Sequence, residues 1–155
     1  MSPSRLITTI PYHDLCYRIT GAAMAVHNEL GPGHKEAHYH HALYVALAGM
    51  GLAVVKEKAV EITMDGVGVG LLYLDLLVDQ AVIVETKAFS HLLTAEVDAQ
   101  VLTYLGATGM AVGMLYNFGR RRLEYKRILP AKNSEQWRER IRRYLFVPTD
   151  PLPVR

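Results

Sequence analysis

Residues 71–89, with the sequence LLYLDLLVDQAVIVETKAF, constrain the fold more than any other part of the chain. Two apolar runs stand on either side of VDQ, a pattern typical of two buried strands joined by a hairpin turn. The runs nevertheless contain the charged residues Asp75, Glu85 and Lys87. An unpaired charge in an apolar interior costs several kcal/mol, so these three side chains need one another or a bound ion.

The alternation of side chains along a strand predicts how the three charges are arranged. On the first strand Asp75 shares a face with Tyr73 and Leu77, and the opposite face carries only apolar residues, namely Leu74, Leu76 and Val78. On the second strand Glu85 and Lys87 share one face, and the other face carries Val82, Val84 and Thr86.

The length of the hairpin loop decides the register between these strands. A three-residue loop, residues 79–81, places Asp75 opposite Glu85 and keeps one face of the sheet apolar. A two-residue loop would place Asp75 opposite Val84 and mix the two faces, so we predict the longer loop. The two carboxylates then repel each other, and one stays protonated unless a cation lies between them. A divalent metal ion would satisfy the pair, and a solvated ion-pair cluster on an edge strand is the structural alternative.

The rest of the sequence predicts one mixed domain. Apolar spacing indicates helices over residues 14–30, 34–50, 94–109 and 134–145, with strands within 52–88 and over 110–118 and 123–129. The crossover from residues 81–88 through the third helix to 110–118 is long enough for a parallel strand pair. This order predicts an α/β (α+β) fold with a mixed β-sheet flanked by helices. We divide the chain into an N-terminal extension (1–12), the domain (13–130), a C-terminal amphipathic helix (131–147) and a flexible tail (148–155).

Composition limits the functional classes. The 155 residues are 50% hydrophobic, which is enough for one core, and 17 basic against 15 acidic residues leave a net charge of +2. This balance excludes a protein that coats nucleic acid nonspecifically, so any contact with nucleic acid should be local. Cys16 has no partner for an internal disulfide, and no signal peptide or membrane-spanning run is recognisable. We therefore expect a soluble, cytoplasmic protein.

A second motif precedes the hairpin. Residues 25–39, AVHNELGPGHKEAHY, contain Gly33, Glu36 and Tyr39, and residues 100–104 read QVLTY. Together with Asp75 and the Glu-x-Lys of residues 85–87, this ordered set resembles the PD-(D/E)xK nuclease superfamily and, within it, the small GxxExxY family. The resemblance covers residues 13–129 and implies a restriction-endonuclease-like fold.

The resemblance implies metal-dependent hydrolysis of phosphodiester bonds in nucleic acid, DNA rather than RNA. In that family pattern Glu36, Asp75, Glu85 and the backbone carbonyl of Thr86 would hold Mg²⁺ or Mn²⁺, because hard oxygen ligands suit these ions. Lys87 would position water or neutralise developing charge. Gln100 and Tyr104, one helical turn apart, would face the same cleft. The alternative from another class is a catalytically idle nuclease-fold module that serves in binding or assembly.

Several features admit both a functional and a structural interpretation. Gln100 and Tyr104 could face the cleft or could be ordinary residues of a helix surface. The arginines of residues 119–122, GRRR, could contact a phosphate backbone or could only make a turn soluble. We assign four histidines to a solvated helix face rather than to a zinc site: His34, His38, His40 and His41. A zinc site is disfavoured because no cysteine or acidic residue completes the ligand set. The C-terminal helix carries an apolar stripe that could pack on its own domain or on a neighbour, and we expect a homo-oligomer.

Overall fold

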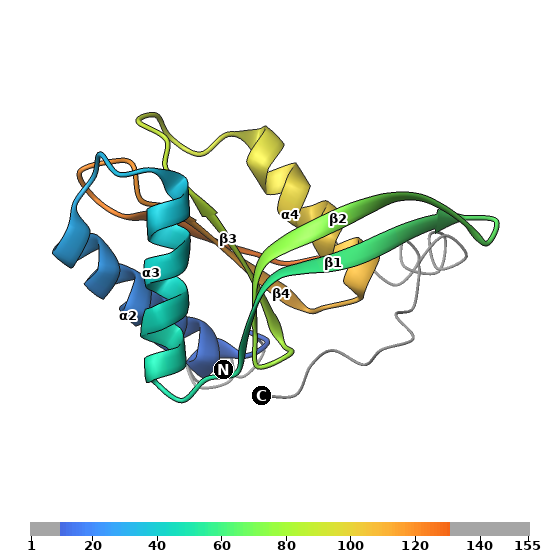
Figure 1. Cartoon of the computed structure of the whole chain (residues 1–155), viewed down its shortest axis with the longest axis horizontal. Helices are drawn as coiled ribbons and strands as arrows, with labels where there is room; N and C mark the ends of the chain where they lie inside the picture. The colour runs from blue at the N-terminus through green and yellow to red at the C-terminus, as the bar shows by residue number, and fades with distance from the viewer. Residues whose placement is uncertain (1–9, 131–155) are drawn as a thin grey trace, which may run out of the picture.

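The computed structural model describes residues 10–130, which form one mixed sheet with helices on both faces (Figure 1). In chain order the elements are α2 (His13–Leu30), α3 (Glu36–Gly49), β1 (Val54–Met64), β2 (Val67–Val78), β3 (Val82–Lys87), α4 (Ala95–Thr108), β4 (Val112–Asn117) and β5 (Glu124–Ile128). The predicted order of helices and strands is confirmed for this part of the chain. The predicted C-terminal helix (131–147), the tail (148–155) and residues 1–9 lie outside the described residues.

The sheet runs in the order β1-β2-β3-β4-β5. Neighbouring strands are antiparallel except β3 and β4, which are parallel and joined through α4, as the length of the crossover predicted. β3 is buried from Val82 to Thr86, and β4 is buried throughout. Strands that are covered on both faces read as continuous apolar runs, which is the pattern these two segments have.

Helices α2 and α3 cover one face of the sheet and α4 covers the other (Figure 1). On the first face Ile19 and Leu43 pack with Val84 and Met114. On the second face Ile83 packs with residues of α4, which places a second core beside the charged positions of β3. Within residues 10–130 no helix is long and apolar enough to cross a membrane.

The hairpin between β2 and β3 has the predicted three-residue loop. Its pairs are Val78 with Val82, Leu77 with Ile83 and Leu76 with Val84, and continuing this register places Asp75 opposite Glu85. β3 is therefore a central strand, and its Glu85 is only 2% exposed. The interpretation of the charges as a solvated cluster on an edge strand is wrong, because the sheet is covered on both faces.

One part of the predicted alternation is also wrong. Leu74 was expected to share a face with Leu76 and Val78, but it packs with Leu77 on the face that α4 covers. The ladder between β1 and β2 pairs Lys56 with Leu76 and Lys58 with Leu74 and has no pair between them. Glu57, at that position, has a φ of 53°, a left-handed conformation that is unusual for a residue other than glycine. This irregularity changes the phase of the side-chain alternation at Asp75.

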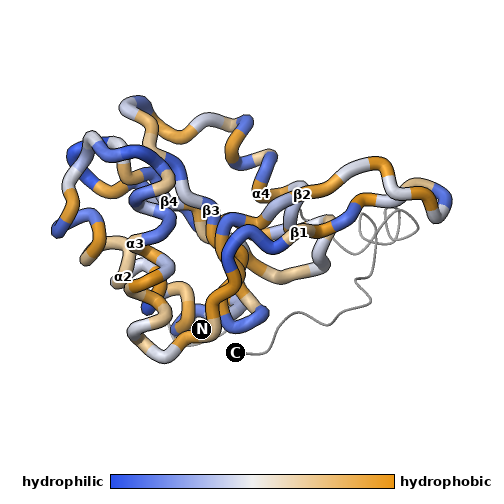
Figure 2. The backbone as a smooth tube through the Cα atoms, in the orientation of Figure 1, coloured by the Kyte–Doolittle hydropathy of each residue, from blue (hydrophilic) through white to orange (hydrophobic). Residues whose placement is uncertain are grey.

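The β1–β2 hairpin extends beyond the body of the sheet as an arm (Figure 1). Figure 2 shows hydrophobic segments along this arm. Five large apolar residues on the arm are more than half exposed: Met64, Val67, Val69, Leu71 and Tyr73. The arm therefore carries apolar surface that the described core does not cover.

We expect Val84→Ala to lower the free energy of unfolding by about 1–3 kcal/mol, because it leaves a cavity in the core under α2 and α3. Val69→Ala is the matched control, since Val69 is 57% exposed and its truncation leaves no cavity. Urea denaturation of both variants measures the difference. Equal stabilities for the two variants would contradict the placement of β3 in the centre of the sheet.

Candidate functional site

The site begins where β2 separates from β3. The last pair between these strands is Leu76 with Val84, and beyond it the half-buried Asp75 side chain bridges the two strands. Its Oδ2 accepts hydrogen bonds from the backbone N–H of Thr86 at 2.9 Å and from Thr86 Oγ1 at 3.1 Å. A carboxylate thus takes the place of a backbone acceptor, and it fixes Asp75 beside the strand that carries Glu85 and Lys87.

Glu85 is buried between the sheet and α4. Its Oε2 lies 3.3 Å from Lys87 Nζ, and its Oε1 has no hydrogen-bond partner among residues 10–130. Burial, reinforced by the charge of Asp75, raises the pKa of Glu85 to about 8, although Lys87 acts in the opposite direction. Buried polar atoms are usually satisfied, so this lone oxygen marks a place where the described residues alone do not complete the site.

Glu36 joins this group from the other face of the molecule. It is the first residue of α3, and its side chain is exposed. Partial desolvation raises the pKa of Glu36, with Asp75 adding to the rise while Lys87 and His40 oppose it. Glu36 also contributes to the raised pKa of Glu85. The four predicted charged residues therefore lie in one electrostatic cluster at the end of β3.

The turn before Glu36 is held by the other two members of the sequence pattern. Gly33 has a φ of 104°, which favours glycine. The Tyr39 hydroxyl donates to the carbonyl of Gly31 at 2.5 Å and accepts from the N–H of His34 at 3.0 Å. The Tyr39 ring stacks on Phe118 with 4.9 Å between centroids. Gly33 and Tyr39 thus shape the turn that positions Glu36.

Gln100 and Tyr104 approach from α4. Gln100 Nε2 donates to the Tyr104 hydroxyl at 2.7 Å, and Tyr104 is only 5% exposed. Burial raises the pKa of Tyr104, and the charges of Glu85 and Asp75 raise it further. Tyr104 thus lies within electrostatic range of Glu85 and Asp75, and the bond from Gln100 fixes its hydroxyl. The roles of Gln100 and Tyr104 in the site stay predictions.

Two residues of the site were not predicted. His40 Nε2 donates to the backbone carbonyl of Asp75 at 3.0 Å, so His40 does not belong to the solvated face assigned to it. His34, His38 and His41 are exposed, as expected. The signal for His40 was its position one turn after Glu36 on the same helix.

Asn117 is the second residue that sequence analysis missed. It is fully buried at the end of β4, beside Lys87. Its Oδ1 accepts from the N–H groups of Phe89 at 2.8 Å and Gly119 at 3.2 Å, and its Nδ2 donates to the carbonyl of His91 at 3.0 Å. A single amide thus fixes the loops that follow β3 and β4. An asparagine inside the apolar run of residues 110–118 was the available signal.

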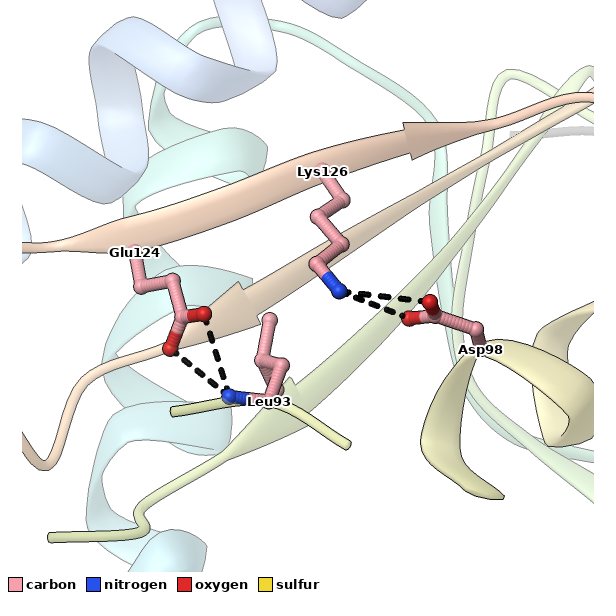
Figure 3. A network of polar contacts seen from close by, with 4 residues as sticks. All are labelled: Leu93, Asp98, Glu124 and Lys126. Carbon is pink, nitrogen blue, oxygen red and sulfur yellow. Dashed lines mark hydrogen bonds and ion pairs between the residues drawn. The ribbon is translucent and has the colours of Figure 1, made fainter. Parts of the chain in front are cut away.

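Polar contacts also fix the start of α4 against β5 (Figure 3). Both carboxylate oxygens of Glu124 accept from the N–H of Leu93 at 3.0 Å. Lys126 Nζ lies 3.2 Å from Asp98 Oδ2. These contacts hold the helix that carries Gln100 and Tyr104 in place relative to β3.

The donors present fit a water-rich Mg²⁺ or Mn²⁺ site. Within residues 10–130 no group of three or more His, Cys, Asp or Glu side chains is arranged to hold a metal ion by itself. Mg²⁺ does not require such a cage, because it keeps several waters and uses one or two carboxylates together with substrate phosphates. Asp75 and Glu85 supply carboxylates at the place where Glu85 Oε1 has no hydrogen-bond partner among the described residues. The ligand roles of Glu36, Asp75, Glu85 and Thr86 stay predictions.

In metal-free protein we expect Glu85 to make the fold less stable as pH rises. Its pKa of about 8 in the folded chain lies above the ordinary value of 4.5, so the folded state binds this proton more tightly. The resulting stabilisation is complete below 4.5 and is lost as the pH rises through 8. Glu85→Gln should remove this loss and should melt at or above the wild-type temperature at pH 8.5.

Thermal melts in EDTA between pH 5 and 8.5 measure this difference, because Gln has nearly the same size and cannot ionise. Glu29→Gln is the matched control, since Glu29 is exposed on α2. A Glu85→Gln protein that unfolds well below wild type at every pH would instead make Glu85 and Lys87 a stabilising ion pair.

Comparison with known proteins places this geometry in a family. A family model described as the PD-(D/E)XK nuclease superfamily matches residues 13–128. Searches among curated proteins and among solved structures gave no significant match. The family match spans the whole described sheet and every candidate residue from Glu36 to Tyr104. The chain belongs to the PD-(D/E)XK nuclease superfamily.

Proposed function

We propose that this protein is a nuclease that uses Mg²⁺ or Mn²⁺ to hydrolyse phosphodiester bonds in DNA. The observation that carries the proposal is the cluster at the end of β3, where Asp75, Glu85 and Lys87 meet and one buried carboxylate oxygen lacks a partner in the described part of the chain. Family membership supports the reaction class. Gly33, Glu36 and Tyr39 further support assignment to the GxxExxY family, and we infer that the protein works in the cytoplasm.

The proposed ligands are the carboxylates of Asp75, Glu85 and Glu36 and the backbone carbonyl of Thr86. When bound, the ion would polarise the scissile phosphate and lower the pKa of the attacking water. In the reaction the water oxygen bonds to phosphorus while the bond from phosphorus to the leaving sugar oxygen breaks.

Four other side chains of the site have distinct roles in the proposed reaction. Lys87, 3.3 Å from Glu85, orients the attacking water and stabilises negative charge on the phosphate oxygens. The Lys87 ammonium stays in this position because its partner, Glu85, is buried. Gln100 holds the Tyr104 hydroxyl at 2.7 Å, and Tyr104 directs that polar group toward Lys87 or a phosphate oxygen. His40 fixes the backbone of Asp75 from the other side.

A second candidate function is a nuclease-fold module that binds nucleic acid without cutting it. The observation that favours it is the ion pair between Lys87 and Glu85, which partly neutralises the site without any metal. This candidate predicts binding to nucleic acid with no divalent-dependent cleavage.

The nuclease proposal predicts cleavage of plasmid or single-stranded DNA in the presence of Mg²⁺ or Mn²⁺, with none in EDTA. Asp75→Asn and Glu85→Gln should each lower the rate by at least about 100-fold, because each removes one charge from the proposed ion site. Glu29→Gln should cut at the wild-type rate. Cleavage that persists in Asp75→Asn would identify a contaminant, and binding without cleavage by the wild type would favour the idle module.

We also propose that the chain forms a homo-oligomer, with a two-fold pair as the simplest arrangement. The exposed apolar residues of the arm, together with the edge strand β1, supply a surface for a second copy. Light scattering at micromolar concentration should give a multiple of 17.3 kDa. Val69→Lys should lower the mass if the arm is the interface, and deletion of residues 131–155 should lower it if the predicted C-terminal helix is. A wild-type mass of one chain would refute the oligomer.

A further inference from the structure

A cavity between the turn before α3 and the loops that follow β3 and β4 is bordered by three arginines. It has a volume of about 680 Å³ and is lined by Pro32, Ser90, Gly119 and Arg120, Arg121 and Arg122. We call it the arginine pocket. We propose that the arginine pocket binds the phosphates of the nucleic-acid strand next to the scissile bond. This inference rests on the proposed nuclease function and assigns the path of its substrate.

The walls of the arginine pocket come from the same segments that build the site. Pro32 lies in the turn that leads into Glu36, and Ser90 lies in the loop that follows Lys87. Gly119 follows the end of β4, whose Asn117 pairs with Lys87 in the parallel ladder. A strand whose scissile phosphate reaches Lys87 would therefore have its neighbouring phosphates at this pocket.

The loop that follows β3 and the loop that follows β4 are in close contact at Gly119. A Cβ atom there would lie 2.4 Å from the carbonyl oxygen of Phe89 and 2.5 Å from the backbone carbon of Ala88. Neither backbone contact can yield easily, so a side chain at position 119 does not fit. The N–H of Phe118 also donates to the carbonyl of Lys87 at 2.8 Å. The arginine loop is thus attached directly to the end of the strand that carries Lys87.

The backbone of the arginine loop is fixed while its charges stay available. The carbonyl of Arg120 accepts from the buried His27 Nε2 at 2.8 Å, and Asn117 accepts from the N–H of Gly119. Arg121 and Arg122 are exposed. Within residues 10–130 no carboxylate forms an ion pair with any of the three guanidinium groups, whereas Lys87 and Lys126 both have acidic partners.

Three guanidinium groups without a carboxylate partner among the described residues, on an anchored loop, suit a polyanion. Guanidinium groups bind phosphate oxygens in a bidentate manner and are weakly hydrated, so they favour phosphate over most other anions. The net charge of the chain is only +2, so we expect its contact with nucleic acid to depend on local clusters of basic residues. We therefore favour a phosphate track over a solubilising turn as the role of residues 119–122.

The first test is the salt dependence of DNA binding. Fluorescence anisotropy of a labelled duplex is measured in EDTA over a series of salt concentrations, on the Glu85→Gln background so that no cleavage occurs. Arg121→Gln/Arg122→Gln should reduce the slope of log affinity against log salt by about 2 and weaken binding about tenfold at low salt, because two phosphate contacts are lost. Arg18→Gln/Arg127→Gln is the matched control with the same change in charge at two other exposed arginines.

The second test separates this pocket from the reacting phosphate. Bis(p-nitrophenyl) phosphate has one phosphodiester and no neighbouring phosphates, so Arg121→Gln/Arg122→Gln should hydrolyse it at the wild-type rate. On duplex DNA the same variant should show a raised KM with an unchanged kcat. An equal loss on both substrates would place the arginines at the reacting phosphate and would overturn the proposal.

The outcomes distinguish failure of the pocket from failure of the proposed function. If the wild type cuts DNA but the arginine variant keeps the wild-type salt slope, only the arginine pocket is refuted. A fall in slope that is equal in the control variant would also refute it, because net charge alone would explain the effect. If the wild type neither cuts nor binds DNA, the proposed function and the pocket fall together.

Discussion

The bond between the Asp75 carboxylate and the backbone of Thr86 is the contact on which the arrangement of the site depends. It lies where β2 leaves β3, and it supplies an acceptor for an N–H that the strand ladder no longer pairs. The arm can therefore diverge from the sheet without leaving a buried donor unsatisfied. The same bond holds a carboxylate beside Glu85, so the geometry of the sheet and the charge cluster have one origin.

The cluster is held in an electrostatically unfavourable state by the fold around it. Two covered faces exclude water from Glu85, and Asp75 adds repulsion, so the buried carboxyl retains its proton to an unusually high pH. Lys87 offsets only part of this cost, since one Glu85 oxygen has no partner among the described residues. A chain selected for stability alone would place an apolar side chain here. The position is therefore better explained by a ligand that brings positive charge.

The sequence predicted those features that depend on local periodicity. The three-residue loop followed from the need to keep Val82 and Val84 in the core, and the parallel pair followed from the length of the crossover. The position of Leu74 was predicted wrongly, because the irregular backbone at Glu57 arises from pairing between strands and has no signature in the alternation itself. Strict alternation therefore holds only as far as the ladder stays regular.

Within the site, the charged residues and the motif residues around them were predicted, but His40 and Asn117 were not. Asp75 and Glu85 were recognisable because a charge in an apolar run is conspicuous. His40 and Asn117 act through bonds to backbone groups on other elements, and such bonds depend on which segments the fold brings together. A single sequence shows the polar side chain but does not show which backbone group it will contact. These roles could therefore be recognised only in the structure.

The motif around Glu36 connects the two sides of the proposed active site. Gly33 and Tyr39 contribute backbone freedom and hydrogen bonds rather than charge, and together they fix one turn. That turn carries Glu36 toward Asp75 and Lys87, and its Pro32 forms part of the wall of the arginine pocket. Tyr39 also stacks on Phe118, next to the arginine loop. A change in this turn would therefore affect both Glu36 and the wall of the arginine pocket.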